Sequence, residues 1–216
     1  MTKIDSISRL QDALDKDLAW RKKEINELKF QCEIVPPLMI IHKSAILLIY
    51  AHWEGFIKNA AKFYLQFLNN QKLLCKNMQD NFLILHLGSA FQEEVNYKLF
   101  SHRERILNEL NKSLNCEFLV CEHKTINTNS NLKSEVFKLI LEQLGIPQNE
   151  FETKFNMIDQ KLLKYRNAIA HGEKRPDKDI YSVVNEIKDD IVELLDKFHE
   201  QIILAAENQK YLKINK

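Results

Sequence analysis

Residues 38–68 read LMIIHKSAILLIYAHWEGFIKNAAKFYLQFL, and they carry apolar side chains on nearly every face of the helix that they predict. A helix that is apolar all round must be surrounded by other elements, so we expect it to be the central helix of the fold. Pro36-Pro37 end whatever helix comes before it. His42 and Lys43 interrupt its longest hydrophobic run, which is shorter than the roughly 20 residues of a membrane span. We therefore predict a buried helix and no membrane contact.

Amphipathic patterns flank this central helix. Apolar residues recur at helical spacing among charges before and after it. The predicted helix 132–144 has a signal at each end. Asn131 is a suitable N-cap, and Gly145 is suited to the C′ position that ends the helix, with Pro147 just beyond it. The predicted helices cover residues 4–31, 38–68, about 91–111, 132–144, 152–171 and 179–212.

The composition favours the same fold class. Only four Gly and four Pro occur in 216 residues, which favours long helices over a turn-rich β fold. We predict one all-α domain over residues 1–216, an antiparallel helical bundle with an elaborated middle at about 69–130. Within that middle, Glu117–Val120 and the Thr/Asn/Ser-rich stretch 125–131 predict irregular or short β structure.

Charge and cysteine content exclude several classes of function. The formal net charge is +1, so any nucleic-acid contact must be local and not a broad positive surface. Four cysteines without a disulfide-framework spacing, and no apolar leader, predict a cytoplasmic protein with free thiols. Cys116, Cys121 and His123 lack the spacing of a zinc site, and no phosphate loop or hydrolase motif occurs. We expect no metal and no cofactor.

Residues 166–172 read RNAIAHG and place an arginine and a histidine five positions apart at a predicted helix end. The planar guanidinium of Arg166 suits paired contacts with phosphate oxygens and is permanently charged. His171 is the side-chain type that exchanges protons near neutral pH. At about 100° per residue, Tyr165 and Ile169 face the core whereas Asn167 and His171 point away from it. This placement favours a functional over a structural histidine.

Cleavage of RNA by its own 2′-hydroxyl requires a base, an acid and cations that stabilise a negatively charged phosphorane. One histidine cannot easily serve on both sides of the same phosphorus, and no second histidine lies near the motif. Ala168 and Ala170 would allow close approach on the motif face. We therefore expect a two-fold dimer with the site at its interface, where two copies of Arg166 and His171 meet.

The RNxxxH motif followed by Gly172 resembles the signature of the HEPN superfamily. Ala51–Phe56 (AHWEGF), Asn131-Leu132 and Ala170–Glu173 (AHGE) resemble one toxin-type bacterial HEPN family, and with these anchors the resemblance covers most of the chain. It implies a dimeric, metal-independent endoribonuclease that cleaves single-stranded RNA, often a toxin encoded beside an antitoxin protein or within a defence locus.

The same resemblance implies roles for individual residues. Arg166 and His171 would be catalytic, Asn167 would assist by hydrogen bonding, and Glu54 is a weaker candidate that could instead pair with Lys58 at i,i+4 spacing. Lys174 and Arg175 follow the motif and could guide an RNA backbone. His52 and Trp53 are expected to pack in the core.

Two alternatives to a ribonuclease stay open. Some HEPN domains keep the fold without cleavage, so the chain could be a non-catalytic RNA-binding or protein-interaction module. Some HEPN toxins are silenced by nucleotide transfer to a tyrosine near the motif, but the expected core-facing position of Tyr165 makes it a poor acceptor.

Overall fold

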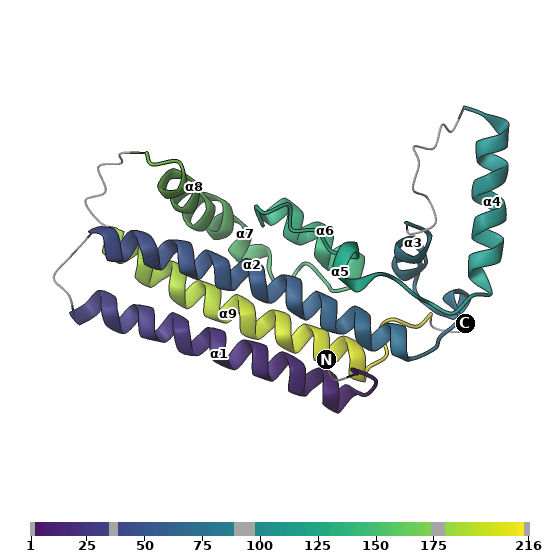
Figure 1. The fold of residues 1–216 in the computed structure, drawn as a ribbon, viewed down its shortest axis with the longest axis horizontal. Coiled ribbons are helices and arrows are strands. Elements are labelled where there is room, and N and C mark those ends of the chain that lie inside the picture. The colour runs from purple at the N-terminus through teal and green to yellow at the C-terminus, as the bar shows by residue number, and fades with distance from the viewer. Residues whose placement is uncertain (1–2, 35–38, 89–97, 174–179, 214–216) are drawn as a thin grey trace.

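In the computed structural model, three long helices lie side by side and each packs against the other two (Figure 1). They are α1 (Ile7–Ile34), α2 (Met39–Asn70) and α9 (Ile180–Glu207). α1 runs opposite to α2 and α9 (Figure 1). α2 is the most apolar of the three. The structure describes residues 3–34, 39–88, 98–173 and 180–213.

A fourth, continuous helical segment crosses α2 and α9 on the side away from α1 (Figure 1). It consists of α7 (Glu152–Met157), the π-helical turn η2 (Ile158–Leu163) and α8 (Lys164–Ala170). The chain therefore alternates direction between successive long elements, which confirms the all-α antiparallel bundle.

One detail of the sequence prediction for this segment is wrong. The segment is not uniformly α-helical, because η2 is a π turn, which holds more residues than an α turn. Ala168 packs inward and is buried, whereas Ala170 is exposed. Ala168 is therefore wrong as part of an exposed motif face. Tyr165 and Ile169 are partly buried against the core, as predicted.

Aromatic side chains join the layers of the bundle. Trp53 of α2 meets Phe137 edge to face, with ring centroids 4.9 Å apart, and Phe137 meets Phe151 at 5.2 Å and Phe198 of α9 at 5.8 Å. All of these residues are buried. Such pairs add about 0.5–1.5 kcal/mol each beyond the burial of their area. These neighbours explain most of the apolar pattern of α2, but the helix is not surrounded on every side as expected, because Ile40, Leu47, Leu48 and Ala51 are exposed.

α6 (Ser134–Leu144) carries Phe137 and starts later than expected. Asn131 is not its N-cap: the Asp159 carboxylate of η2 accepts the Ser134 backbone N–H at 2.9 Å and its hydroxyl at 2.5 Å. Gly145 ends the helix with a left-handed φ of +67°, as predicted, and Ile146 N–H bonds to the Leu141 carbonyl at 2.9 Å.

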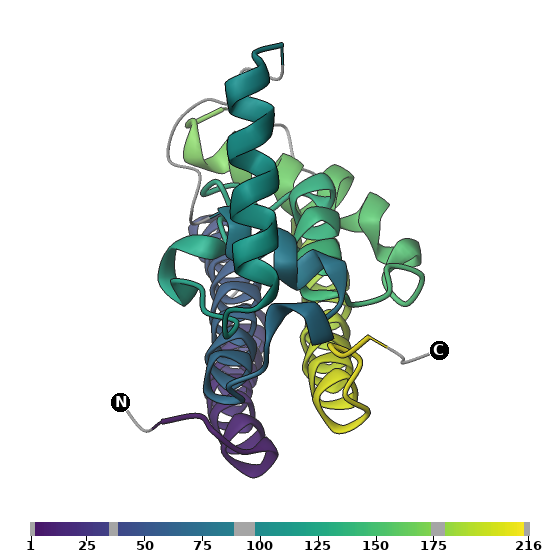
Figure 2. The ribbon, with the colours of Figure 1, turned by 90° about the vertical axis from the view of Figure 1, so that its right-hand side faces the viewer.

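The middle segment is more helical than predicted. It contains the 3-10 turn η1 (Cys75–Asn77), α3 (Asp80–Gly88), α4 (Phe100–Leu114) and α5 (Glu122–Thr125). α3 was missed, and the predicted helix 91–111 matches α4 only in part, since residues 89–97 lie outside the described residues. α4 stands out from one end of the bundle (Figures 1 and 2).

The two ends of this segment are joined to each other and to the end of α2. A single antiparallel β-bridge joins Leu74 to Glu117, which confirms the short β structure expected there. The Asn69 amide at the end of α2 pairs with both backbone groups of Val120, at 2.9 and 3.1 Å. Across the described residues no helix combines the length and apolarity that a membrane span requires.

Candidate functional site

Arg166 of α8 lies against α2. Its Cζ atom is 4.5 Å from the centroid of the Tyr50 ring, Nη1 donates to Asn167 Oδ1 at 2.8 Å and Nη2 donates to the Ser130 carbonyl at 3.3 Å. A guanidinium has five N–H donors. Within the described part of the chain, the other Arg166 N–H groups have no hydrogen-bond partner. They can donate hydrogen bonds to phosphate oxygens without breaking either existing bond.

His171 follows the last residue of α8. Its backbone N–H donates to the Asn167 carbonyl at 2.9 Å, and Gly172 turns the chain with a left-handed φ of +69°. The imidazole is exposed and makes no hydrogen bond to a described residue. Five residues at 1.5 Å each place Arg166 and His171 about 7.5 Å apart along the helix axis. Asn167 contacts both, through its side chain and its carbonyl.

A tight loop at 128–132 covers α2 beside Arg166. The Tyr50 hydroxyl accepts the Leu132 N–H at 2.8 Å, and the Trp53 indole donates to the Leu132 carbonyl at 3.3 Å. Asn129 and Ser130 both adopt left-handed conformations, with φ of +55° and +53°. Asparagine adopts this conformation readily, but serine does so at a cost, and the contacts from α2 to Thr128 and Leu132 flank Ser130 on both sides.

Glu54, the weaker candidate from the sequence, belongs to this loop anchor. Its carboxylate accepts the Thr128 hydroxyl at 2.5 Å and the Tyr50 phenol. Burial raises the pKa of the Tyr50 phenol well above its ordinary value, and the hydrogen bond to Glu54 raises it further. The phenol is therefore protonated at neutral pH. Tyr50 connects Glu54 on one side to Arg166 on the other.

The opposite face of the AHWEG sequence packs against α1. Arg21 is buried, and its Nη1 donates to the His52 carbonyl at 3.4 Å. A Cβ atom on Gly55 would lie only 2.7 Å from the same nitrogen, which explains the glycine. Burial is the main cause that lowers the pKa of His52, although Glu24 lies 3.2 Å from its Nε2. His52 and Trp53 therefore pack in the core, as predicted.

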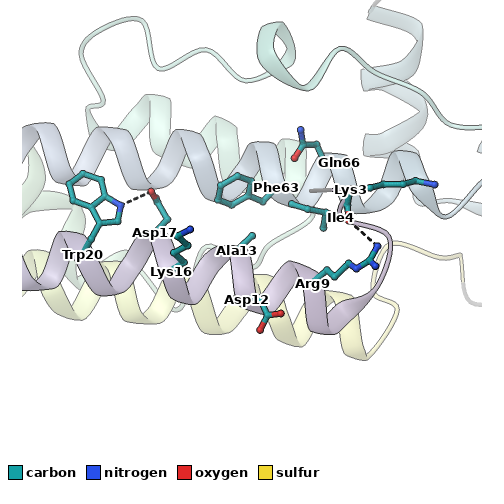
Figure 3. A pocket seen from close by; sticks show the side chains of 10 residues that line it. All are labelled: Lys3, Ile4, Arg9, Asp12, Ala13, Lys16, Asp17, Trp20, Phe63 and Gln66. Carbon is teal, nitrogen blue, oxygen red and sulfur yellow. Dashed lines mark hydrogen bonds between the residues drawn. The ribbon is translucent and has the colours of Figure 1, made fainter. Parts of the chain in front are cut away.

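A hollow of about 490 Å³ lies between α1 and α2 (Figure 3). Figure 3 shows Trp20 at its end with the indole directed at Asp17, a bond of 3.0 Å. Neither α8 nor the 128–132 loop lines this hollow, so it is separate from Arg166 and His171. Its lining residues are Lys3, Ile4, Arg9, Asp12, Ala13, Lys16, Asp17, Trp20, Phe63 and Gln66.

Arg166, Asn167 and His171 lie within one turn and a half at the end of α8, and the Arg166 side chain contacts that of Asn167. Lys174 and Arg175 lie outside the described residues. Sequence reasoning missed Tyr50 and Ser130; the one available signal for Tyr50 was its position one helical turn before Glu54. No cluster of three or more histidine, cysteine, aspartate or glutamate side chains suited to a metal ion occurs in the described ranges.

The model of the RiboL-PSP-HEPN family matches residues 16–204. The chain belongs to this family. The match includes the α2 sequence that anchors the loop and the α8 motif, so both lie within the RiboL-PSP-HEPN domain. No curated protein and no solved structure matches the chain. The helical bundle is the fold expected of a HEPN domain.

Proposed function

We propose that this HEPN protein is a metal-independent endoribonuclease that cleaves single-stranded RNA through attack of the 2′-hydroxyl on the adjacent phosphate. One observation carries the proposal: Arg166 is held with unused N–H donors near an exposed histidine at the end of the same helix. HEPN domains are associated with RNA cleavage or RNA binding. The biological role that fits is a toxin of a toxin–antitoxin or defence system, with an antitoxin protein as partner.

Each residue has a defined task in this reaction. The Arg166 guanidinium stabilises the charge that develops on the non-bridging oxygens of the phosphorane. The His171 imidazole transfers the proton, either from the 2′-hydroxyl or to the leaving 5′-oxygen. Asn167 fixes the guanidinium through its Oδ1 atom. Lys174 and Arg175, just beyond the helix, would guide the RNA backbone.

The second proton transfer requires a second histidine, and a two-fold dimer supplies it. Apolar side chains are exposed along α2 next to Tyr50, with Ile40, Leu47 and Leu48 exposed by 67, 37 and 45%. Ala51 extends the same exposed face. An apolar helix face of this kind beside an incomplete site is suited to contact with a second copy. We define these four residues as the α2 stripe.

A charge in the α2 stripe is expected to separate the dimer. Leu48→Asp would place a carboxylate in an apolar interface, where it has no partner and must lose its hydration. Light scattering coupled to size exclusion should report twice the chain mass for the wild type and one chain mass for the variant, with cleavage reduced about tenfold or more.

Leu139→Asp is the matched control for this change. Leu139 lies on α6, is 51% exposed and is outside the α2 stripe. It should leave both mass and cleavage unchanged. A Leu48→Asp protein that stays dimeric would place the interface elsewhere, and a monomeric wild type would contradict the dimer itself.

Cleavage of a labelled single-stranded RNA in excess EDTA tests the reaction class. The wild type should cleave without divalent metal and leave a 2′,3′-cyclic phosphate on one product and a 5′-hydroxyl on the other, because the 2′-oxygen is the nucleophile. Mass spectrometry of the products identifies both termini. Products with a 5′-phosphate, or cleavage only after Mg²⁺ is added, would contradict this mechanism.

A second candidate function is a HEPN module that binds RNA or protein without turnover. The observation that favours it is that Arg166 already contacts the Tyr50 ring and the Ser130 carbonyl, as a structural arginine would. RNA binding measured in the same samples distinguishes the two functions. Binding without cleavage by a folded dimer supports the module.

A further inference from the structure

We propose that Tyr50 is a positioning residue of this site, which holds the Arg166 guanidinium and the 128–132 loop in a single arrangement around the scissile phosphate. The inference rests on the proposed function, because it assigns a role within the same site. Two separate parts of the Tyr50 side chain support this inference: the ring and the hydroxyl.

The ring is a platform for the guanidinium. Arg166 Cζ lies 4.5 Å from the ring centroid, within the distance of about 6 Å at which a cation is attracted to an aromatic face. The ring covers one face of the guanidinium, while Asn167 and Ser130 take up two of its N–H groups. These three contacts fix the plane of the guanidinium and its rotation within that plane. The remaining N–H groups are then presented in one direction before RNA binds.

The hydroxyl fixes the loop that supplies one of those contacts. It accepts the Leu132 N–H at 2.8 Å and donates to the Glu54 carboxylate, which also accepts the Thr128 hydroxyl at 2.5 Å. Both ends of the loop are thus anchored to Tyr50, directly or through Glu54. Between these anchors Ser130 is held in its left-handed conformation, with its carbonyl toward Arg166.

Tyr50 takes no part in proton transfer. Burial and the bond to Glu54 raise the pKa of its phenol, so the group stays protonated at neutral pH and cannot act as a base. Its hydroxyl proton is already donated to Glu54. The contribution of Tyr50 is therefore geometric.

Two substitutions separate the ring from the hydroxyl. Tyr50→Leu removes both, and we expect kcat to fall about 30- to 100-fold with a smaller change in KM, because the lost interactions orient a group that acts in the transition state. Tyr50→Phe keeps the ring and loses the loop anchor, so kcat should fall about 3- to 10-fold. The control is Tyr64→Phe, a fully buried tyrosine on the same helix but about 21 Å further along its axis.

A second measurement needs no RNA. With ¹⁵N-labelled arginine, the Nε–H resonance of Arg166, assigned by its loss in Arg166→Lys, should be displaced by the ring current in the wild type and in Tyr50→Phe. In Tyr50→Leu it should move to the position of an exposed arginine. An unchanged resonance in Tyr50→Leu, or wild-type kcat in that variant, would overturn the inference.

The two measurements also separate this inference from the proposed function. If the wild type cleaves RNA and Tyr50→Leu cleaves equally well, the proposed ribonuclease activity is supported and the positioning role of Tyr50 is excluded. If the wild type does not cleave RNA, the proposed ribonuclease activity is excluded. The Arg166 Nε–H resonance alone then decides whether Tyr50 positions Arg166.

Discussion

His171→Ala should lower kcat/KM for RNA cleavage by about 10³-fold or more. Loss of one proton-transfer group costs about 10²–10⁴ in rate, and in a two-fold dimer the substitution removes both the base and the acid. The imidazole is exposed and forms no hydrogen bond to a described residue, so the free energy of unfolding should change by less than about 0.5 kcal/mol. Single-turnover cleavage with excess enzyme measures the effect on the chemical step.

His123→Ala is the control for this substitution. His123 is an exposed histidine on the short helix α5, remote in sequence from the motif. Its removal should leave cleavage unchanged. Equal activity of the wild type and His171→Ala would exclude His171 as the proton-transfer group and would point to a different site or to a contaminating nuclease.

Asp17→Ala should cause the largest loss of stability among single charge removals in the bundle. The Asp17 carboxylate accepts bonds from Arg21 Nε at 2.9 Å, from the Trp20 indole at 3.0 Å and from the Asn59 amide at 3.2 Å. The Arg21 and Asp17 side chains are only 7 and 12% exposed. Removal of one partner leaves a buried, unpaired guanidinium, which costs about 3–5 kcal/mol.

Urea denaturation followed by circular dichroism measures this loss. For a chain of this size it corresponds to a fall in Tm of about 6–20 °C. Asp12→Ala, an exposed aspartate on the same helix, should change stability by less than about 0.5 kcal/mol. In Asp17→Ala/Arg21→Met the unpaired charge is gone, so part of the stability should return. Equal effects of Asp12→Ala and Asp17→Ala would contradict the assignment.

The long helices could be predicted from the sequence because their signals are local. The apolar pattern and Pro36-Pro37 define α2, and Gly145 and Gly172 mark two helix ends. The start of α6 could not be predicted, because Asp159 on another element caps it. The π-helical turn left no signal in the periodicity, and the burial of Ala168 depends on tertiary contacts that a helical pattern does not show.

Some residues of the candidate site could likewise be predicted from the sequence, and others could not. Arg166, Asn167 and His171 lie within six consecutive positions, and their residue types alone indicated phosphodiester chemistry. The partners of Arg166 could not be inferred, since Ser130 is 36 positions away and Tyr50 lies on a different helix. Only the tertiary fold shows that Glu54 contacts the loop through Thr128, 74 positions away.

The π-helical turn η2 also controls the direction in which the motif points. It lies immediately before α8, and its wide turn already holds about one residue more than an α turn, so deletion of one residue would leave the direction of α8 unchanged. Insertion of a single codon within 158–163 would lengthen the helix by only about 1.5 Å but would rotate α8 by about 100° and turn Arg166 away from the Tyr50 ring. A mutation that leaves all motif residues intact could thus silence the site, and the length of this turn is as much a part of the motif as the spacing between its arginine and histidine.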